Sequence, residues 1–312
     1  MRVLMLFLDG VGLGPPDPAV NPFFAAKLPA FRSLFDGEFP SLRKQTLTSQ
    51  AASVLPLDAN LGVDGLPQSG TGQTALFTGT NASKMIGKHF GPHPYSTLRP
   101  VIREKNVFKQ LVGAARRPYF ANAFPQRFFD YVSQRRNRLT VTTLSCMYSG
   151  LPLLKAQDLR EGLGVSADIT SGGWKELGYP DMPTIHPAEA GRRLVELSRA
   201  NDFVLFEYWK TDHAGHTENF AEAVEVLERL DGMVAGIVET MDVRSTLLFI
   251  TSDHGNIEDM STKTHTRNPV PAILYGRNHN AVAAQLHTAN GADITSVTPL
   301  LMDLITERHQ TH

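Results

Sequence analysis

Residues 3–9 of this chain read VLMLFLD, a run of six apolar residues that ends on an aspartate. Residues 203–216 (FVLFEYWKTDHAGH) and 247–256 (LLFITSDHGN) repeat this arrangement, with histidines close behind the acid. Short apolar runs rich in branched side chains are typical of buried strands in an α/β sheet. The three runs therefore predict strands of one sheet, each followed by polar groups at its carboxyl end.

The polar residues after these strands are expected to meet, because ligands of α/β sheets bind beyond the carboxyl ends of the strands. The expected members are Asp9, Asp212, His216, Asp253, His254 and His265. Any one of them alone is more ordinary as a cap, a turn residue or a surface residue. Several carboxylates at one sheet edge, however, repel each other unless cations hold them. Mixed carboxylate and imidazole ligands suit manganese, zinc or iron, so the sequence predicts a metal site.

Composition narrows the other possibilities. The chain has 312 residues, of which 42% are hydrophobic, enough to bury a large core. A formal net charge of -1 creates no field for nucleic acid or an anionic membrane surface, so we expect neither as a partner. The single cysteine, Cys146, excludes an intramolecular disulfide framework. The apolar run at the N-terminus is too short for a signal peptide or a membrane span, and we expect a cytoplasmic protein.

A glycine-rich turn, residues 65–74 (GLPQSGTGQT), precedes an expected helix that stops near Gly79. A serine in such a place is most often a helix cap. A turn of this kind also offers backbone amides to a phosphate at the helix N-terminus. A neighbouring cation would lower the pKa of the serine hydroxyl and make it a nucleophile. We therefore expect Ser69 to be catalytic, with Thr71 as the alternative if the turn is shifted.

Together these segments resemble the alkaline phosphatase superfamily of two-metal enzymes. Within it, the likeness is to cofactor-independent phosphoglycerate mutases and phosphopentomutases. The resemblance is carried by residues 8–10 (LDG), 65–72 (GLPQSGTG), 212–217 (DHAGHT), 252–256 (SDHGN) and 265–271 (HTRNPVP). It implies a three-layer α/β/α sandwich with a mostly parallel sheet and a small inserted lid.

The resemblance also implies ligands for two divalent metal ions. The expected sets are Asp212, His216 and His265 for one ion, and Asp9, Ser69, Asp253 and His254 for the other. Manganese or zinc is expected before magnesium because of the imidazole ligands. Ser69 would attack phosphorus and form a phosphoserine, which then passes its phosphoryl group to water or to a second hydroxyl of the substrate.

The spacer after the nucleophile helix favours hydrolysis. Residues 83–106 are too few for the large second domain that the mutases insert at this place. We therefore expect a phosphate-ester hydrolase acting on a small phosphorylated metabolite. The alternatives are a phosphomutase of the phosphosugar or phosphoglycerate type, a phosphodiesterase, and a sulfate- or phosphonate-ester hydrolase on the same core. A metal-binding regulatory protein without turnover is the hypothesis from another class, and the presence of Ser69 beside a full ligand set argues against it.

Residues 1–123 and 185–312 are expected to form the catalytic core, and the less regular residues 124–184 a lid inserted into it. The expected substrate-binding residues are Asn122, Arg127 and His213. The sequence also predicts a helix over residues 23–35. A second, long amphipathic helix is expected over residues 221–241, where apolar side chains recur at three- and four-residue steps.

Overall fold

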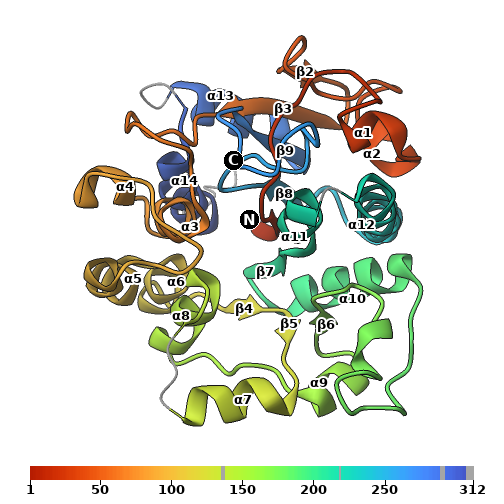
Figure 1. The fold of residues 1–312 in the computed structure, drawn as a ribbon. Helices are drawn as coiled ribbons and strands as arrows, with labels where there is room; N and C mark the ends of the chain where they lie inside the picture. The colour runs from red at the N-terminus through yellow and green to blue at the C-terminus, as the bar shows by residue number, and fades with distance from the viewer. Residues whose placement is uncertain (135–137, 218, 289–291, 307–312) are drawn as a thin grey trace, which may run out of the picture.

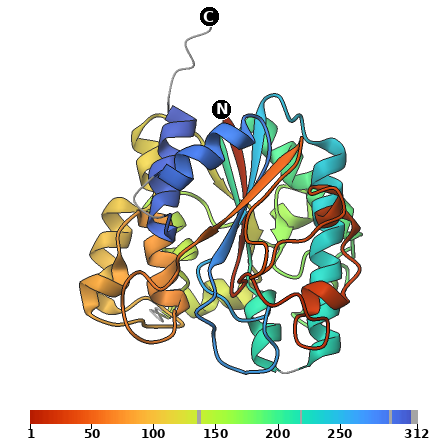
Figure 2. The ribbon, with the colours of Figure 1, turned by 90° about the horizontal axis from the view of Figure 1, so that it is seen from above.

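The computed structural model describes residues 1–134, 138–217, 219–288 and 292–306. At its centre is a seven-stranded sheet in the order β2-β3-β9-β8-β1-β7-β4. Helices cover both faces of this sheet (Figures 1 and 2). The strands are β1 (Arg2–Leu8), β2 (Leu47–Thr48), β3 (Ala52–Leu57), β4 (Pro118–Phe120), β7 (Phe203–Tyr208), β8 (Thr246–Thr251) and β9 (Val270–Gly276). The expected α/β/α class is confirmed.

The three strands that carry the predicted ligands are neighbours. β1 lies between β8 and β7 and runs parallel to both, and β4 continues the parallel part beyond β7. β9, by contrast, is antiparallel to β8 and to β3, and β2 is antiparallel to β3. Because β1, β7 and β8 are parallel and adjacent, their carboxyl ends open at one edge of the sheet.

Alternation along β1 separates two apolar layers, as expected for side chains that point to opposite faces of a strand. Val3, Met5 and Phe7 pack into one cluster, whereas the even-numbered leucines of β1 pack into the other. The helices of the first layer are α3 (Ser69–Thr78), α5 (Arg99–Lys105), α6 (Val107–Gly113), α8 (Val141–Tyr148), α13 (His279–Thr288) and α14 (Val297–Thr306). Those of the second are α1 (Pro22–Ala25), α2 (Pro29–Ser33), α10 (Pro187–Ala200) and α12 (Phe220–Thr240).

The prediction of one helix over residues 23–35 was wrong. The chain forms α1 and α2 there, interrupted at Leu28, whose φ of -119° and ψ of 61° are not helical. α1 ends at Ala25, and Ala26 is extended. A residue before proline is disfavoured in the α conformation, so Pro29 keeps Leu28 out of a continuous helix and starts α2. The long helix predicted over residues 221–241 is confirmed as α12.

Residues 122–177 build the part of the molecule beyond β4 (Figure 1). Its elements are β5 (Asn122–Ala123), α7 (Gln126–Ser133), α8, α9 (Ala156–Arg160) and β6 (Val165–Ser166), with a 3₁₀ turn at Gly172–Trp174. β5 and β6 pair as a separate small sheet, whereas α8 buries Val141, Leu144 and Cys146 in the first core layer. The boundaries expected for a lid stay a prediction.

Four further short elements complete the described chain. They are α4 (Ala82–Ile86), α11 (Lys210–Thr217) and 3₁₀ turns at Ser96–Leu98 and Ile294–Ser296. None of the described helices combines the length and the apolar character that a membrane span requires.

Candidate active site

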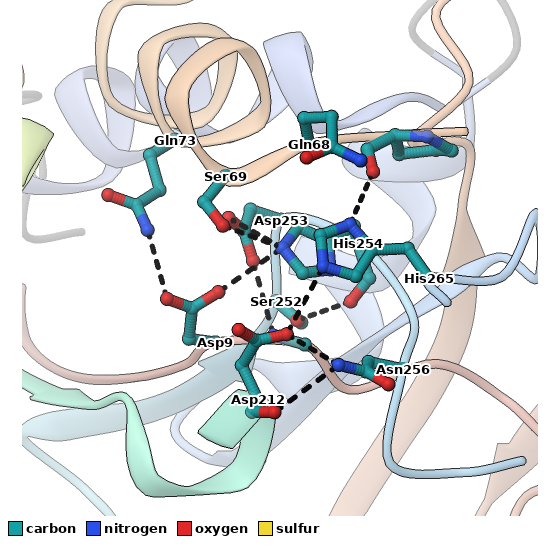
Figure 3. Close-up of polar contacts among 12 residues, drawn as sticks. Asp9, Gln68, Ser69, Gln73, Asp212, Ser252, Asp253, His254, Asn256 and His265 are labelled. Atoms are coloured by element: carbon teal, nitrogen blue, oxygen red, sulfur yellow. Dashed lines mark hydrogen bonds and ion pairs between the residues drawn. The ribbon is translucent and has the colours of Figure 1, made fainter. Parts of the chain in front are cut away.

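The segments that follow β1, β7 and β8 bring the predicted carboxylates together (Figure 3). Asp9 comes directly after β1, Asp212 lies in the first turn of α11, and Asp253 follows β8. Gly10 allows this convergence, because its φ is +69° and a Cβ there would lie 2.7 Å from Asp212 Oδ1. Only glycine adopts this backbone conformation without strain and leaves the space for α11.

Three histidines present their Nε2 atoms to these carboxylates. The Nδ1 atom of His265 lies 2.6 Å from the Pro67 carbonyl, and that of His216 lies 2.8 Å from the Lys263 carbonyl. His254 Nδ1 has a longer contact of 3.3 Å with the carbonyl of the next residue. Metal-binding histidines usually turn their other ring nitrogen to such an acceptor, which orients the ring and leaves one nitrogen for the ion.

The first group that could hold a metal ion is Asp212, His216 and His265, the three residues that the resemblance implied for one ion. Asp212 Oδ2 lies 3.4 Å from His216 Nε2, and Asp212 Oδ1 lies 3.4 Å from His265 Nε2. The two Nε2 atoms are only 3.1 Å apart. Two imidazole nitrogens and a carboxylate at these distances suit a shared proton or a shared divalent cation.

The second group is Asp9, Asp212 and His254, so Asp212 belongs to both. His254 Nε2 lies 3.3 Å from Asp9 Oδ1 and 3.6 Å from Asp253 Oδ2. Both of these buried carboxylate oxygens lack a hydrogen-bond partner among the described residues. A buried carboxylate oxygen without a partner is costly, and a cation removes that cost. The donor set therefore fits divalent metal ions, although it places Asp212 between the two predicted sets.

The electrostatics of this group without metal also indicate a cation site. Burial lowers the pKa of His254, but the charges of Asp253, Asp9 and Asp212 outweigh it and raise this pKa to about 10. Burial and the charge of Asp9 raise the pKa of Asp253. Burial alone would raise the pKa of Asp212. Hydrogen bonds from His216 and His265 outweigh burial and lower the pKa of that carboxyl. The cluster thus binds protons strongly where a metal would compete with them.

Ser69 lies at this cluster. It is the first residue of α3, whose cap is Gln68, and its Oγ lies 2.9 Å from His254 Nε2. Thr71 is directed elsewhere, since its Oγ1 donates to the Gln68 carbonyl at 3.1 Å and accepts from the Phe90 amide at 3.2 Å. The structure therefore brings Ser69, rather than Thr71, to the metal-ligand cluster.

Two amide side chains to which the sequence assigned no role orient the carboxylates. Gln73 Nε2 donates to Asp9 Oδ2 at 3.2 Å, and Asn256 Nδ2 donates to Asp212 Oδ1 at 2.7 Å. Gln73 lies one turn after Ser69 on α3, which is the local signal that points it toward the same site.

Glu258 is a further residue that sequence reasoning missed. It is fully buried and accepts hydrogen bonds from the amides of Gly12 and Asn256 at 2.8 and 2.7 Å. It also accepts from Thr266 Oγ1 and from Asn268 Nδ2. Glu258 thereby connects the loop after β1, the loop after β8 and the segment that follows His265. Its only sequence signal is its place two residues after Asn256.

Two of the three predicted substrate-binding residues, Asn122 and Arg127, line a larger cavity beside the cluster, whereas His213 is not in its wall. A cavity of about 470 Å³ contains Ser69 and the first ligand group in its wall, and one of about 860 Å³ is lined by Asn122 and Arg127. The Asn122 amide is engaged, because it donates to the Glu207 carbonyl and accepts from the Glu207 amide, both at 2.8 Å. His213 is exposed and packs edge-on against Trp209, a residue of the larger cavity.

Comparison with known proteins agrees with this geometry. Residues 179–306 match the model of the Metalloenzyme superfamily. The chain is 31% identical over 125 residues to a 2,3-bisphosphoglycerate-independent phosphoglycerate mutase of Pyrococcus abyssi, covering 36% of this chain and 29% of that protein. It is 34% identical over 101 residues to the protein of the same name from Methanococcus vannielii, covering 32% and 23%. The matches thus span less than a third of these relatives.

Solved structures extend the likeness to the whole fold. The PH0037 protein of Pyrococcus horikoshii superimposes with a TM-score of 0.59 at 14% identity, covering 100% of this chain and 98% of that one. An alkaline phosphatase from the Antarctic bacterium TAB5 has a TM-score of 0.53 at 11% identity, covering 99% and 98%. The fold is therefore alkaline phosphatase-like. Asp9 and Ser69 lie outside residues 179–306, and the fold brings them next to the candidate ligands within that range.

Proposed function

We propose that this protein is a metal-dependent phosphotransferase in which Ser69 takes the phosphoryl group of a small phosphate ester. The observation that carries this proposal is the contact of 2.9 Å between Ser69 Oγ and His254 Nε2, inside a cluster with unpartnered buried carboxylate oxygens. The residues that would hold two divalent ions, manganese or zinc, are Asp212, His216 and His265 together with Asp9, Asp253, His254 and Ser69.

The residues of the chain have distinct tasks in this reaction. Bound divalent ions would neutralise the phosphoryl oxygens and lower the pKa of the serine hydroxyl. Ser69 sits at the positive end of the α3 dipole, which favours negative charge on Oγ and on the incoming phosphate. Gln73 and Asn256 hold the carboxylates of Asp9 and Asp212 by hydrogen bonds.

The transfer has two balanced steps. In the first, the bond from Ser69 Oγ to phosphorus forms while the ester bond breaks, and the substrate alcohol leaves with a proton. In the second, an acceptor hydroxyl attacks the phosphoserine and Ser69 is restored. The sequence relatives support a hydroxyl of the substrate itself as acceptor, which makes the reaction that of a phosphomutase.

Hydrolysis, with water as acceptor, is the second candidate. It was the first expectation from the sequence, on the length of residues 83–106. The likeness of the fold to that of an alkaline phosphatase also supports hydrolysis.

The test is to follow the phosphoryl group. Metal-stripped protein is reloaded with manganese or zinc and incubated with phosphorylated metabolites, and phosphoserine is detected by intact mass. We expect phosphorylation of the wild type, none in Ser69→Ala with metals still bound, and retained phosphorylation in Thr71→Val. Transfer to a second hydroxyl of the substrate identifies a mutase, and phosphate release a hydrolase. Absence of phosphoserine from the metal-loaded wild type would overturn the proposal.

A further inference from the structure

The cavity of about 860 Å³ is unexplained by phosphoryl transfer alone. We call it the side cavity. It lies between the end of β7, the small sheet of β5 and β6, and α7. Cavities of roughly 300–1,000 Å³ bury drug-sized ligands, so the side cavity is large for a three-carbon metabolite.

The side cavity adjoins the candidate active site. Pro92 lines the smaller cavity that contains Ser69, and the next residue, His93, lines the side cavity. Asp212 borders the smaller cavity, and Lys210, in the same turn of α11, borders the larger. The walls of the two cavities are thus built in part from adjacent residues, and with the phosphate of an ester at Ser69 we place its organic part in the side cavity.

Aromatic side chains form much of the wall of the side cavity. They are Phe124, Phe128, Tyr131, Trp174 and Trp209. The rings of Phe124 and Phe128 pack with centroids 4.3 Å apart. Trp174 is buried and held by its Nε1, which donates to Ser166 Oγ at 2.7 Å. Rigid aromatic walls of this kind bind flat apolar rings by stacking.

The charged groups of the side cavity favour an anion. Its basic residues are Arg127, Arg138, Lys210 and Arg229, and its acidic residues are Asp168, Glu176 and Glu207. Asp168 accepts a hydrogen bond from the Gly173 amide. Glu207 accepts one from Thr142 Oγ1 through Oε2, whereas its Oε1 has no partner among the described residues, and burial raises the pKa of this carboxyl to about 8. Within the described ranges, no ion pair joins any of the four basic side chains to a carboxylate. Arginine binds a carboxylate through two parallel hydrogen bonds, so such a group would find partners here.

We infer that the side cavity selects phosphate esters whose organic part combines an aromatic ring with a carboxylate. This inference depends on the proposed function, because it places the ester phosphate at Ser69. The aromatic wall takes the ring, and Arg127 and Arg138 take the carboxylate.

The experiment compares three esters of primary alcohols: ethyl phosphate, benzyl phosphate and 3-carboxybenzyl phosphate. Their leaving groups are chemically similar, so differences report on the organic part. With manganese-loaded enzyme we measure kcat/KM for release of the alcohol, the step that mutase and hydrolase share. We expect an increase of about tenfold on adding the ring and about tenfold again on adding the carboxylate, from burial of an aromatic group and a charged hydrogen bond.

A double variant, Arg127→Gln with Arg138→Gln, identifies the residues that recognise the carboxylate. It is expected to abolish the preference for 3-carboxybenzyl over benzyl phosphate. The matched control replaces Arg199 and Arg244, two exposed arginines in surface ion pairs, by glutamine and keeps the preference. Equal kcat/KM for the three esters, or an unchanged preference in the Arg127 and Arg138 variant, would overturn the inference.

A binding experiment separates this inference from the proposed function. Metal-loaded Ser69→Ala protein is titrated by calorimetry with ethylphosphonate and with 3-carboxybenzylphosphonate. Tighter binding of the aromatic compound, together with no turnover of any ester by the wild type, would support the side cavity and overturn the phosphotransferase. Turnover without any difference in binding would overturn the inference alone.

Discussion

Replacing Glu258 by glutamine is expected to destabilise the fold and to weaken metal binding at the same time. The carboxylate is fully buried and joins three loops that carry the metal-ligand cluster. Glutamine has nearly the same shape, so the change removes charge and one acceptor without creating a cavity. The effect therefore reports on the hydrogen bonds of this residue.

The expected loss of unfolding free energy follows from the four hydrogen bonds that Glu258 accepts. The amides of Gly12 and Asn256 share one oxygen, and Thr266 Oγ1 and Asn268 Nδ2 share the other. Glutamine offers one acceptor oxygen, so two donors lose their charged acceptor. A hydrogen bond to a charged group contributes about 1.5–3 kcal/mol. Two such hydrogen bonds therefore contribute about 3–6 kcal/mol. The Thr266 hydroxyl can rotate to accept from the new amide, so we expect a loss at the lower end, about 3 kcal/mol.

The measurement is urea unfolding of both proteins, together with calorimetric titration of manganese into the metal-free forms. Glu239→Gln is the matched control, because Glu239 is 66% exposed and pairs with Arg192 on the surface. The control is expected to change stability by less than about 1 kcal/mol. If Glu258→Gln unfolds at the same urea concentration as the wild type, the assigned role of Glu258 is refuted.

Asp212→Asn is expected to lose at least one metal ion per chain in elemental analysis, because Asp212 belongs to both ligand groups, and full metal content would contradict this assignment. Burial raises the pKa of Glu207 to about 8, from 4.5 in an unfolded chain, so the folded state keeps a proton that the unfolded state loses. In the presence of a chelator, the free energy of unfolding should therefore fall as the pH rises from 4.5 to about 8. Urea unfolding of Glu207→Gln should show a smaller fall, and parallel pH curves for the two proteins would contradict this role of Glu207. Gly72→Ala should lower phosphoserine formation despite the better helix propensity of alanine, because its Cβ would lie 2.7 Å from the Asp253 carbonyl oxygen. Gly113→Ala, with open space around the site, is the control, and equal activity of the two variants would count against this packing.

Local patterns in the sequence predicted the elements and their chemistry. The apolar run of residues 3–8 is strand β1 over Arg2–Leu8, and the acid that follows lies where ligands of such sheets bind. Periodicity predicted α12, whereas the helix over residues 23–35 failed because Pro29 acts on the residue before it. The helix expected to stop near Gly79 is α3, which ends at Thr78, but it already begins at Ser69, inside the stretch expected to be a turn.

Only the tertiary structure decided how these groups meet. The contact of 3.1 Å between His216 and His265 joins residues 49 apart, and Asp212 is shared between two ligand groups. Glu258 and the side cavity left no local pattern, because their partners come from several distant segments. A pattern along the chain reports on neighbours in sequence, which share a helix or strand. Side-chain orientations in loops depend instead on packing between elements. The sequence could therefore predict which acids, histidines and serine gather at this edge of the sheet, but not that Asp212 belongs to two groups or that a large cavity lies beside them.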